Sequence, residues 1–212
     1  MPAKNPLVRW GFDIEPKSKT KPLIHQVHGA TILDASSLKE GAEADGVFTV
    51  EKDTTVFIFT ADCLPVLFYG DSPSSPVMAV HAGWRGAKAG IAKNGLELMS
   101  RHSPRVTAVL GPSLGSCCFE VKDDFISEMV QARGNIERFL SHRDGKMYFD
   151  LVRFVVEEEL KGIQGEVNTS AVRCTYCSRP ELPSYRRNKG TDPRIRAWIY
   201  RLSQDENRLG RT

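Results

Sequence analysis

Three apolar segments in the first half of the chain constrain its fold more than any other feature. They are TTVFIFTAD (residues 54–62), PVLFYGD (65–71) and PVMAVHAG (76–83). Each is short and ends in Asp or Gly, and the first is rich in β-branched and aromatic residues. This pattern is typical of buried strands separated by turns. We therefore expect a sheet at the centre of the molecule.

The rest of the chain alternates between strand-like and helix-like patterns. Apolar residues at helical spacing predict helices over 87–99, over 121–131 and after Asp150, which is a suitable N-cap. In the last helix Val152, Val156, Leu160 and Ile163 share one face, and Glu157, Glu158 and Glu159 lie mostly outside it. Further strands are expected at 23–29, 30–34, 106–112 and 195–202, and residues 179–189 are expected to form a loop.

Composition limits the classes of protein that this chain can belong to. Its 212 residues suit one domain with a sizeable core, and the formal net charge of +3 is too small to indicate nucleic acid or an anionic membrane. We see neither an apolar run long enough to span a bilayer nor a secretion signal in MPAKNPLVRW. We expect one α+β domain, residues 1–212, with mixed β-sheets flanked by helices, in the cytoplasm.

Three metal-ligating residues stand at the ends of predicted strands. His28, Cys63 and His81 each lie where a Gly or Pro interrupts an apolar segment. Thiolate sulfur and imidazole nitrogen are the usual ligands of zinc, and three protein ligands leave a fourth position for water. Zinc-bound water loses a proton near neutral pH and becomes a nucleophile. The alternative is that these residues are structural, because the spacing alone identifies no site.

Two acidic residues close to these segments are ambiguous. Asp62 adjoins Cys63, and it either orients a ligand histidine or is solvated at a strand end. Asp45 precedes Gly46 and is interpreted as a turn residue.

The remaining cysteines have a structural interpretation. Cys174 and Cys177 form a C-x-x-C, but a four-cysteine zinc site needs a second pair at similar spacing. Cys117 and Cys118 are adjacent and fit that requirement badly. Cys118 is either a nucleophile or a buried packing residue, and an odd total of five cysteines argues against a disulfide framework.

Six strings occur in one order along the chain: HQVHG, TADCLPVLF, AVHAGWRG, GPSLGSCCFEV, YFDL and SYRRNKG. Together they closely resemble the laccase-domain or polyphenol-oxidase-like family, from about Leu23 to Leu202. The resemblance implies a single domain with mixed sheets flanked by helices, similar to a group of cysteine hydrolases. It also implies zinc ligands at His28, Cys63 and His81.

The activity that this resemblance implies is phosphorolysis of adenosine, inosine, guanosine and methylthioadenosine, together with deamination of adenosine. Purine nucleoside and phosphate are then the partners. Arg85 is the first candidate for a contact with the phosphate anion, and Arg186 and Arg187 are further candidates. We also expect Asp62 to lie at the substrate site. The chain is expected to be a monomer or homodimer. Its N-terminal segment, residues 1–22, is shorter than is usual in the family, which puts part of the pocket in doubt.

Three other functions stay open. A hydrolase acting on a cell-wall peptide or amide would use Cys63 as nucleophile and His81 as base, without metal. A protein–protein module would keep the metal only for folding. A copper-dependent polyphenol oxidase would add an axial methionine, for which Met78 is the nearest candidate in sequence.

Overall fold

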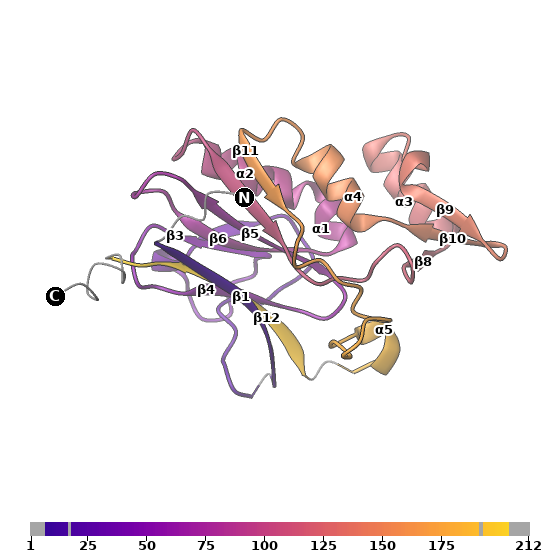
Figure 1. Cartoon of the computed structure of the whole chain (residues 1–212), viewed down its shortest axis with the longest axis horizontal. Helices are drawn as coiled ribbons and strands as arrows, with labels where there is room; N and C mark the ends of the chain where they lie inside the picture. Colours follow the sequence, from indigo (N-terminus) through magenta and orange to yellow (C-terminus); the bar gives the residue numbers. More distant parts are fainter. Residues whose placement is uncertain (1–6, 17, 191–192, 204–212) are drawn as a thin grey trace.

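The computed structural model describes residues 7–16, 18–190 and 193–203, and its largest element is a six-stranded mixed sheet (Figure 1). In spatial order the strands are β11 (Gly165–Asn168), β7 (Val106–Leu110), β5 (Leu64–Gly70), β6 (Val77–Ala82), β3 (Gly46–Thr49) and β2 (Ile32–Asp34). The β2–β3 and β7–β11 pairs are parallel, and the other pairs are antiparallel. The expected mixed sheet is confirmed.

The remaining strands form two smaller antiparallel sheets. The first has the order β1 (Val8–Glu15), β12 (Arg194–Arg201) and β4 (Val56–Thr60). The second has the order β8 (Glu120–Val121), β10 (Lys146–Phe149) and β9 (Leu140–Arg143). In Figure 1 the β1–β12–β4 sheet lies on the opposite side of the large sheet from the helices.

The helices are short. They are α1 (Trp84–Ala89), α2 (Ile91–Ser100), α3 (Asp123–Arg133), α4 (Leu151–Phe154), which continues as a π-helical turn (Val155–Glu159), and α5 (Tyr185–Asn188). Two 3₁₀ turns cover Ala35–Ser37 and Glu137–Phe139. As predicted, Asp150 caps its helix by accepting a hydrogen bond from the Arg153 N–H, with an N···O distance of 2.9 Å.

The central strands are apolar throughout because both faces of the large sheet are covered. Alternate residues point to opposite faces of a strand. On β5, Val66 and Phe68 belong to the core beneath the helices, whereas Leu67 and Tyr69 belong to the core shared with the β1–β12–β4 sheet. The α+β class with mixed sheets is therefore confirmed, and the extent of the domain, 1–212 with a short segment 1–22, stays a prediction.

Three predicted elements were wrong in detail. Residues 23–29 form no regular strand, and His25 makes only an isolated bridge to Glu43. The helix expected over 87–99 begins earlier, at Trp84, and is divided at Gly90, whose φ of 88° lies in the left-handed region. The expected loop 179–189 contains the short helix α5.

The expectation that Glu159 lies outside the apolar face of its helix was also wrong. Its carboxylate is buried, accepts a hydrogen bond from the Ala92 N–H at 2.9 Å and pairs with Arg133 at 2.7 Å. Glu159 follows Val152 by seven residues and Val156 by three, spacings that place it on the same helix face as these two valines. Burial raises the pKa of Glu159 to about 7 even though Arg133 opposes the shift.

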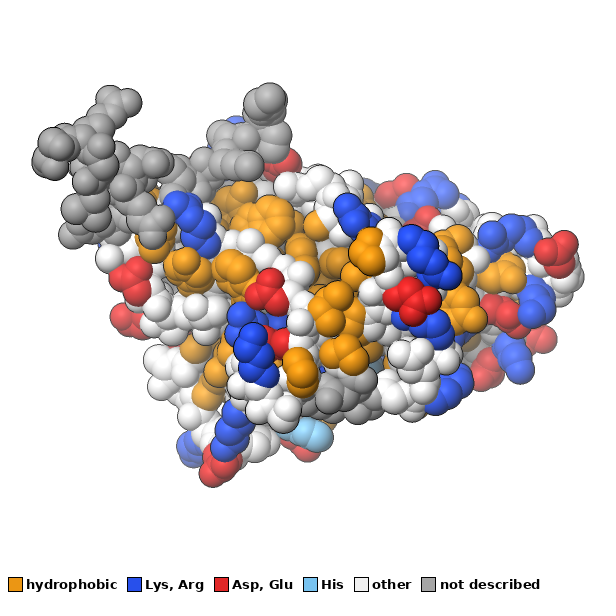
Figure 2. Space-filling view, turned by 60° about the horizontal axis from the view of Figure 1, so that its bottom comes forward, with side chains coloured by type: hydrophobic (Ala, Val, Ile, Leu, Met, Phe, Trp, Pro, Cys, Tyr) orange, Lys and Arg blue, Asp and Glu red, His pale blue; other side chains and the backbone are white. Residues whose placement is uncertain are grey.

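The surface is mixed in character. On the face drawn in Figure 2, Lys and Arg side chains lie among Asp, Glu and apolar side chains, so this face has no large area of one charge. Within the part of the chain that the structure describes, every helix is too short or too polar to cross a bilayer.

Candidate metal centre

Three side chains from separate segments meet beside the large sheet. His28 lies in the irregular segment before β2, Cys63 lies between β4 and β5, and His81 lies near the end of β6. Their ligand atoms all lie within 4.8 Å of one another. The two imidazole rings are 4.8 Å apart and nearly perpendicular, at 70°. The residues that the sequence proposed as ligands are thus brought together.

The register of the central strands explains this meeting. The pairing of β5 with β6 sets Pro65 opposite His81 and Leu64 opposite Ala82. One step further, Cys63 faces Gly83, where an added Cβ would lie only 2.8 Å from the cysteine sulfur and 3.2 Å from the His28 ring. The absence of a side chain at Gly83 therefore leaves the space that the cluster occupies.

Asp45 holds both histidines, although the sequence favoured its interpretation as a turn residue. Its carboxylate is buried and lies 2.8 Å from His81 Nδ1. The same carboxylate accepts hydrogen bonds from the backbone N–H groups of His28 at 2.9 Å and Gly29 at 2.6 Å. A carboxylate on Nδ1 fixes the histidine tautomer and leaves Nε2 for a metal. The only sequence signal was an Asp–Gly pair at the start of β3.

The electrostatics favour the ligating form of the cysteine. Burial acts to raise the pKa of Cys63, but His81 and His28 outweigh it and lower this pKa to about 6. Burial acts to lower the pKa of His81, whereas Cys63 and Asp45 raise it to about 9. A thiolate beside two imidazoles is a donor set that suits zinc. The residues present therefore fit the metal that the resemblance implied.

A cavity of about 700 Å³ opens over the cluster. Besides His28, Cys63 and His81, its wall includes the apolar side chains of Phe59, Leu114 and Phe119. This size and mixture of apolar walls with a few polar groups is usual for small-molecule sites.

Arg85 and Arg186 both line this cavity. The Arg85 guanidinium is exposed and stacks 4.4 Å from the centre of the Trp84 ring, and no carboxylate in the described part of the chain pairs with it. Arg186 lies 5.5 Å from the centre of the Phe119 ring and donates to the Glu120 carbonyl at 3.0 Å. Arg85 therefore has more of its donors free for an anion.

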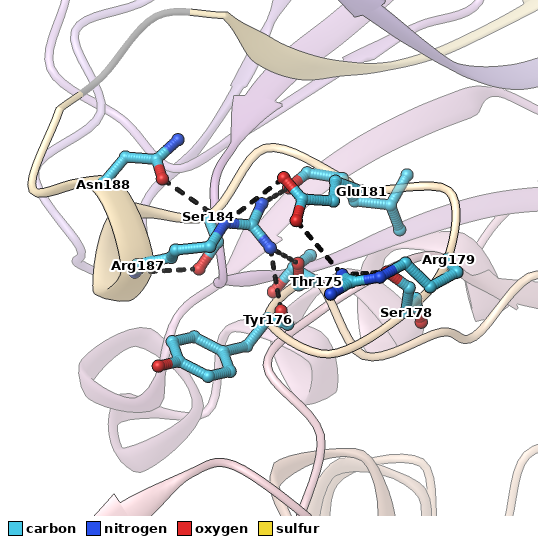
Figure 3. A network of polar contacts seen from close by, with 9 residues as sticks. Thr175, Tyr176, Ser178, Arg179, Glu181, Ser184, Arg187 and Asn188 are labelled. Carbon is cyan, nitrogen blue, oxygen red and sulfur yellow. Dashed lines mark hydrogen bonds and ion pairs between the residues drawn. The ribbon is translucent and has the colours of Figure 1, made fainter.

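Arg187 is engaged elsewhere. Figure 3 shows its guanidinium surrounded by the loop before α5, where it donates to the Tyr176 carbonyl at 2.8 Å and also to Leu182. Its carboxylate neighbour Glu181 lies 4.0 Å away. Arg187 is not among the residues that line the cavity. These contacts assign it to holding the loop.

Asp62 lines the cavity, but its carboxylate is occupied. It accepts hydrogen bonds from the Thr175 hydroxyl at 2.5 Å and from the Arg186 backbone N–H at 2.6 Å. Its φ of 87° shows that it lies in a tight turn rather than in a strand. Asp62 therefore positions the segment that carries Arg186, and its interpretation as an orienter of a ligand histidine has no supporting contact.

Residues 12–201 match the family model described as multi-copper polyphenol oxidoreductase laccase. The chain belongs to this family. The resemblance found in the six sequence strings is confirmed by this match.

Two curated relatives of this chain are both named purine nucleoside phosphorylase. The chain is 40% identical over 149 residues to a purine nucleoside phosphorylase of Aquifex aeolicus, which covers 69% of this chain and 66% of that protein. It is 32% identical over 178 residues to the purine nucleoside phosphorylase YfiH of Escherichia coli, covering 81% of this chain and 71% of that one. YlmD from Geobacillus stearothermophilus has a TM-score of 0.71 at 27% identity, covering 86% of this chain and 73% of that structure.

Proposed function

We propose that this laccase-family protein is a zinc-dependent purine nucleoside phosphorylase of the cytoplasm. It cleaves adenosine, inosine, guanosine and methylthioadenosine with phosphate, and it also deaminates adenosine. The proposal is supported by the name that its relatives share and by the cavity over the His28, Cys63 and His81 cluster. The five cysteines are free, which suits a reducing compartment.

The conformation of His28 is the observation that carries the metal proposal. Its φ of 63° lies in the left-handed region, which a residue with a side chain adopts at a cost of about 1–3 kcal/mol. The N–H groups of residues 27–29 all point at the Asp45 carboxylate, which stabilises this conformation. The result is an imidazole beside Cys63 and His81. A third ligand explains that placement, whereas a cysteine–histidine pair alone does not need it.

Zinc held by these three residues would supply a Lewis acid and an acidified water in its fourth position. The protein residues divide the remaining work. Asp45 keeps the Nδ1 side of His81 occupied, so that Nε2 faces the cluster. The apolar wall with Phe119 and Leu114 receives the purine ring and excludes water, and Arg85 binds phosphate. In phosphorolysis, a phosphate oxygen bonds to the anomeric ribose carbon as the carbon–nitrogen bond breaks and the base leaves with a proton.

A cysteine hydrolase is the second candidate, because Cys63, His81 and Asp45 also have the order of a nucleophile, a base and an orienting carboxylate. That mechanism uses neither His28 nor a metal. Copper-dependent oxidation of phenols has less support. Met78 packs into the core on the helix side of β6, where its sulfur approaches Gly95, and therefore lies on the opposite face from His81.

Turnover of adenosine with and without phosphate tests the proposal. We expect phosphorolysis to release adenine only when phosphate is present, and deamination to release inosine with or without phosphate. Chromatography separates and measures the two products. His28→Ala should reduce both by at least ~100-fold and release the metal from the site formed with Cys63 and His81. A cysteine hydrolase would tolerate this variant. Unchanged turnover in His28→Ala would refute the three-ligand mechanism.

A further inference from the structure

Four of the five cysteines gather at a second place. Cys117 and Cys118 lie in the turn before β8, and Cys174 and Cys177 lie in the loop after β11. Their four sulfur atoms all lie within 4.8 Å of one another. The adjacent pair Cys117 and Cys118 was expected to fit a four-cysteine cluster badly, and the structure shows that it joins one. The reason is local, since residues 116–118 form a turn in which the N–H groups of Cys118 and Phe119 both bond the Gly115 carbonyl at 2.9 Å.

The two loops are joined by backbone contacts that do not involve the sulfurs. The Ser113 N–H donates to the Arg173 carbonyl at 3.1 Å, and the Thr175 N–H donates to the Ser113 carbonyl at 2.9 Å. Arg143 donates to the carbonyls of Ser116 and Cys117, at 2.8 and 3.1 Å. On the other side, Arg187 binds the carbonyl of Tyr176 inside the C-x-x-C (Figure 3). The chain therefore holds the four thiols together.

The spacing matches a tetrahedral metal better than a disulfide. At a zinc–sulfur distance of about 2.3 Å, sulfurs of a tetrahedral site lie about 3.8 Å apart. Cys117 and Cys177 are 3.5 Å apart at sulfur, well beyond the ~2.05 Å of a disulfide. The Gly115 N–H points at the Cys174 sulfur at 3.4 Å, as donors do around ligating thiolates. An added Cβ at Gly115 would lie 3.3 Å from the Cys117 sulfur, so a glycine keeps this space open.

We propose that Cys117, Cys118, Cys174 and Cys177 bind one structural zinc ion. Four protein ligands close the coordination shell, which distinguishes this site from the three-ligand site with its open position. The ion ties the turn at 115–118 to the loop at 174–177. Both segments border the cavity, through Leu114 and Phe119 on one side and through the Thr175–Asp62 hydrogen bond on the other. The zinc therefore stabilises the cavity wall.

Metal analysis of three full-length proteins tests this site independently of the nucleoside activity. They are the wild type, Cys117→Ser/Cys177→Ser, and the matched control Cys63→Ser, which alters only the three-ligand site. All are produced with added zinc and purified with reductant. We expect the double variant to hold about one zinc ion fewer than the wild type, whether or not the three-ligand site is loaded.

The Cys63→Ser protein keeps the sulfur cluster intact and supplies a second readout that does not depend on how the double variant folds. Its zinc should show an X-ray absorption shell of sulfur alone, at about 2.3 Å. Chelation of that zinc should lower its melting temperature. A Cys63→Ser protein without zinc would overturn the proposal. So would native mass spectrometry showing the four cysteines as disulfides in metal-free protein.

Discussion

At the scale of single residues, Asp45 connects most of the candidate centre. One buried carboxylate positions the His81 ring and the His28 backbone, so both histidines of the candidate centre depend on it. A carboxylate is required because it accepts from several donors at once. An amide at this position would accept fewer of these hydrogen bonds and would give His81 a weaker partner.

The variant Asp45→Asn should therefore weaken zinc binding by about 10–100-fold, the usual effect of losing a partner of a ligating histidine. Competition with a chromogenic chelator measures this affinity. Asp144→Asn, at the exposed tip of the β9–β10 hairpin, is the matched control and should bind zinc as the wild type does. Equal affinities for all three proteins would contradict the assigned role of Asp45.

Glu159 gives a prediction for pH. Its folded pKa of about 7 lies above the value of 4.5 expected for an exposed glutamate. Folding therefore takes up a proton between these pH values, and the associated stability is fully present below about pH 4.5 and lost as the pH rises through 7. Glu159→Gln does not titrate. Its free energy of unfolding relative to wild type should rise with pH over this window, by up to about 3 kcal/mol. Urea unfolding at several pH values checks this, and a flat difference would contradict it.

At the scale of elements, the β1–β12–β4 sheet docks against the large sheet through a close contact at Gly111. A Cβ added there would lie 2.3 Å from the Phe12 ring, on β1. Gly111 follows β7 directly and begins the loop that carries Leu114 and the first cysteine pair. The packing of Phe12 on β1 against Gly111 therefore helps to position that loop.

Gly111→Ala should destabilise the protein by about 1–3 kcal/mol, because the ring has to move out of a packed interface. In a Phe12→Leu background the same substitution should cost less, because the ring atoms that would clash are gone. Thermal unfolding of the four proteins in this double-mutant cycle gives the coupling. An equal cost in both backgrounds would show that the Gly111–Phe12 contact is not the cause.

The elements also show which features the sequence could predict. The strands between residues 54 and 83 were predictable because burial on both faces makes them apolar throughout. His28, Cys63 and His81 were singled out from strand ends and from the family strings, and the structure brings them together. Their role as metal ligands stays a prediction. Asp45 was missed because its partners come from residues 27–29 and 81, which only the tertiary structure brings together. The sulfur cluster was missed because its pairs lie on loops some 60 residues apart.

At the scale of the whole molecule, the candidate centre lies where the layers meet. Cys63 occupies the connection between β4 in one sheet and β5 in another, and His81 lies one residue before the end of β6. The helical layer begins directly afterwards, at Trp84 and Arg85. The cavity is therefore lined by both of these sheets and by α1. Strand pairing holds His81, and Asp45 holds the backbone of His28.

The most direct test of the central claim is reconstitution of chelated protein with either zinc or copper, followed by two assays on each sample. We expect zinc to restore phosphate-dependent cleavage of adenosine, and neither metal to support oxidation of a phenol. His81→Ala should be restored by neither metal. Phenol oxidation by the copper-loaded wild type, without nucleoside cleavage by the zinc-loaded protein, would show that the protein is not a zinc-dependent phosphorylase.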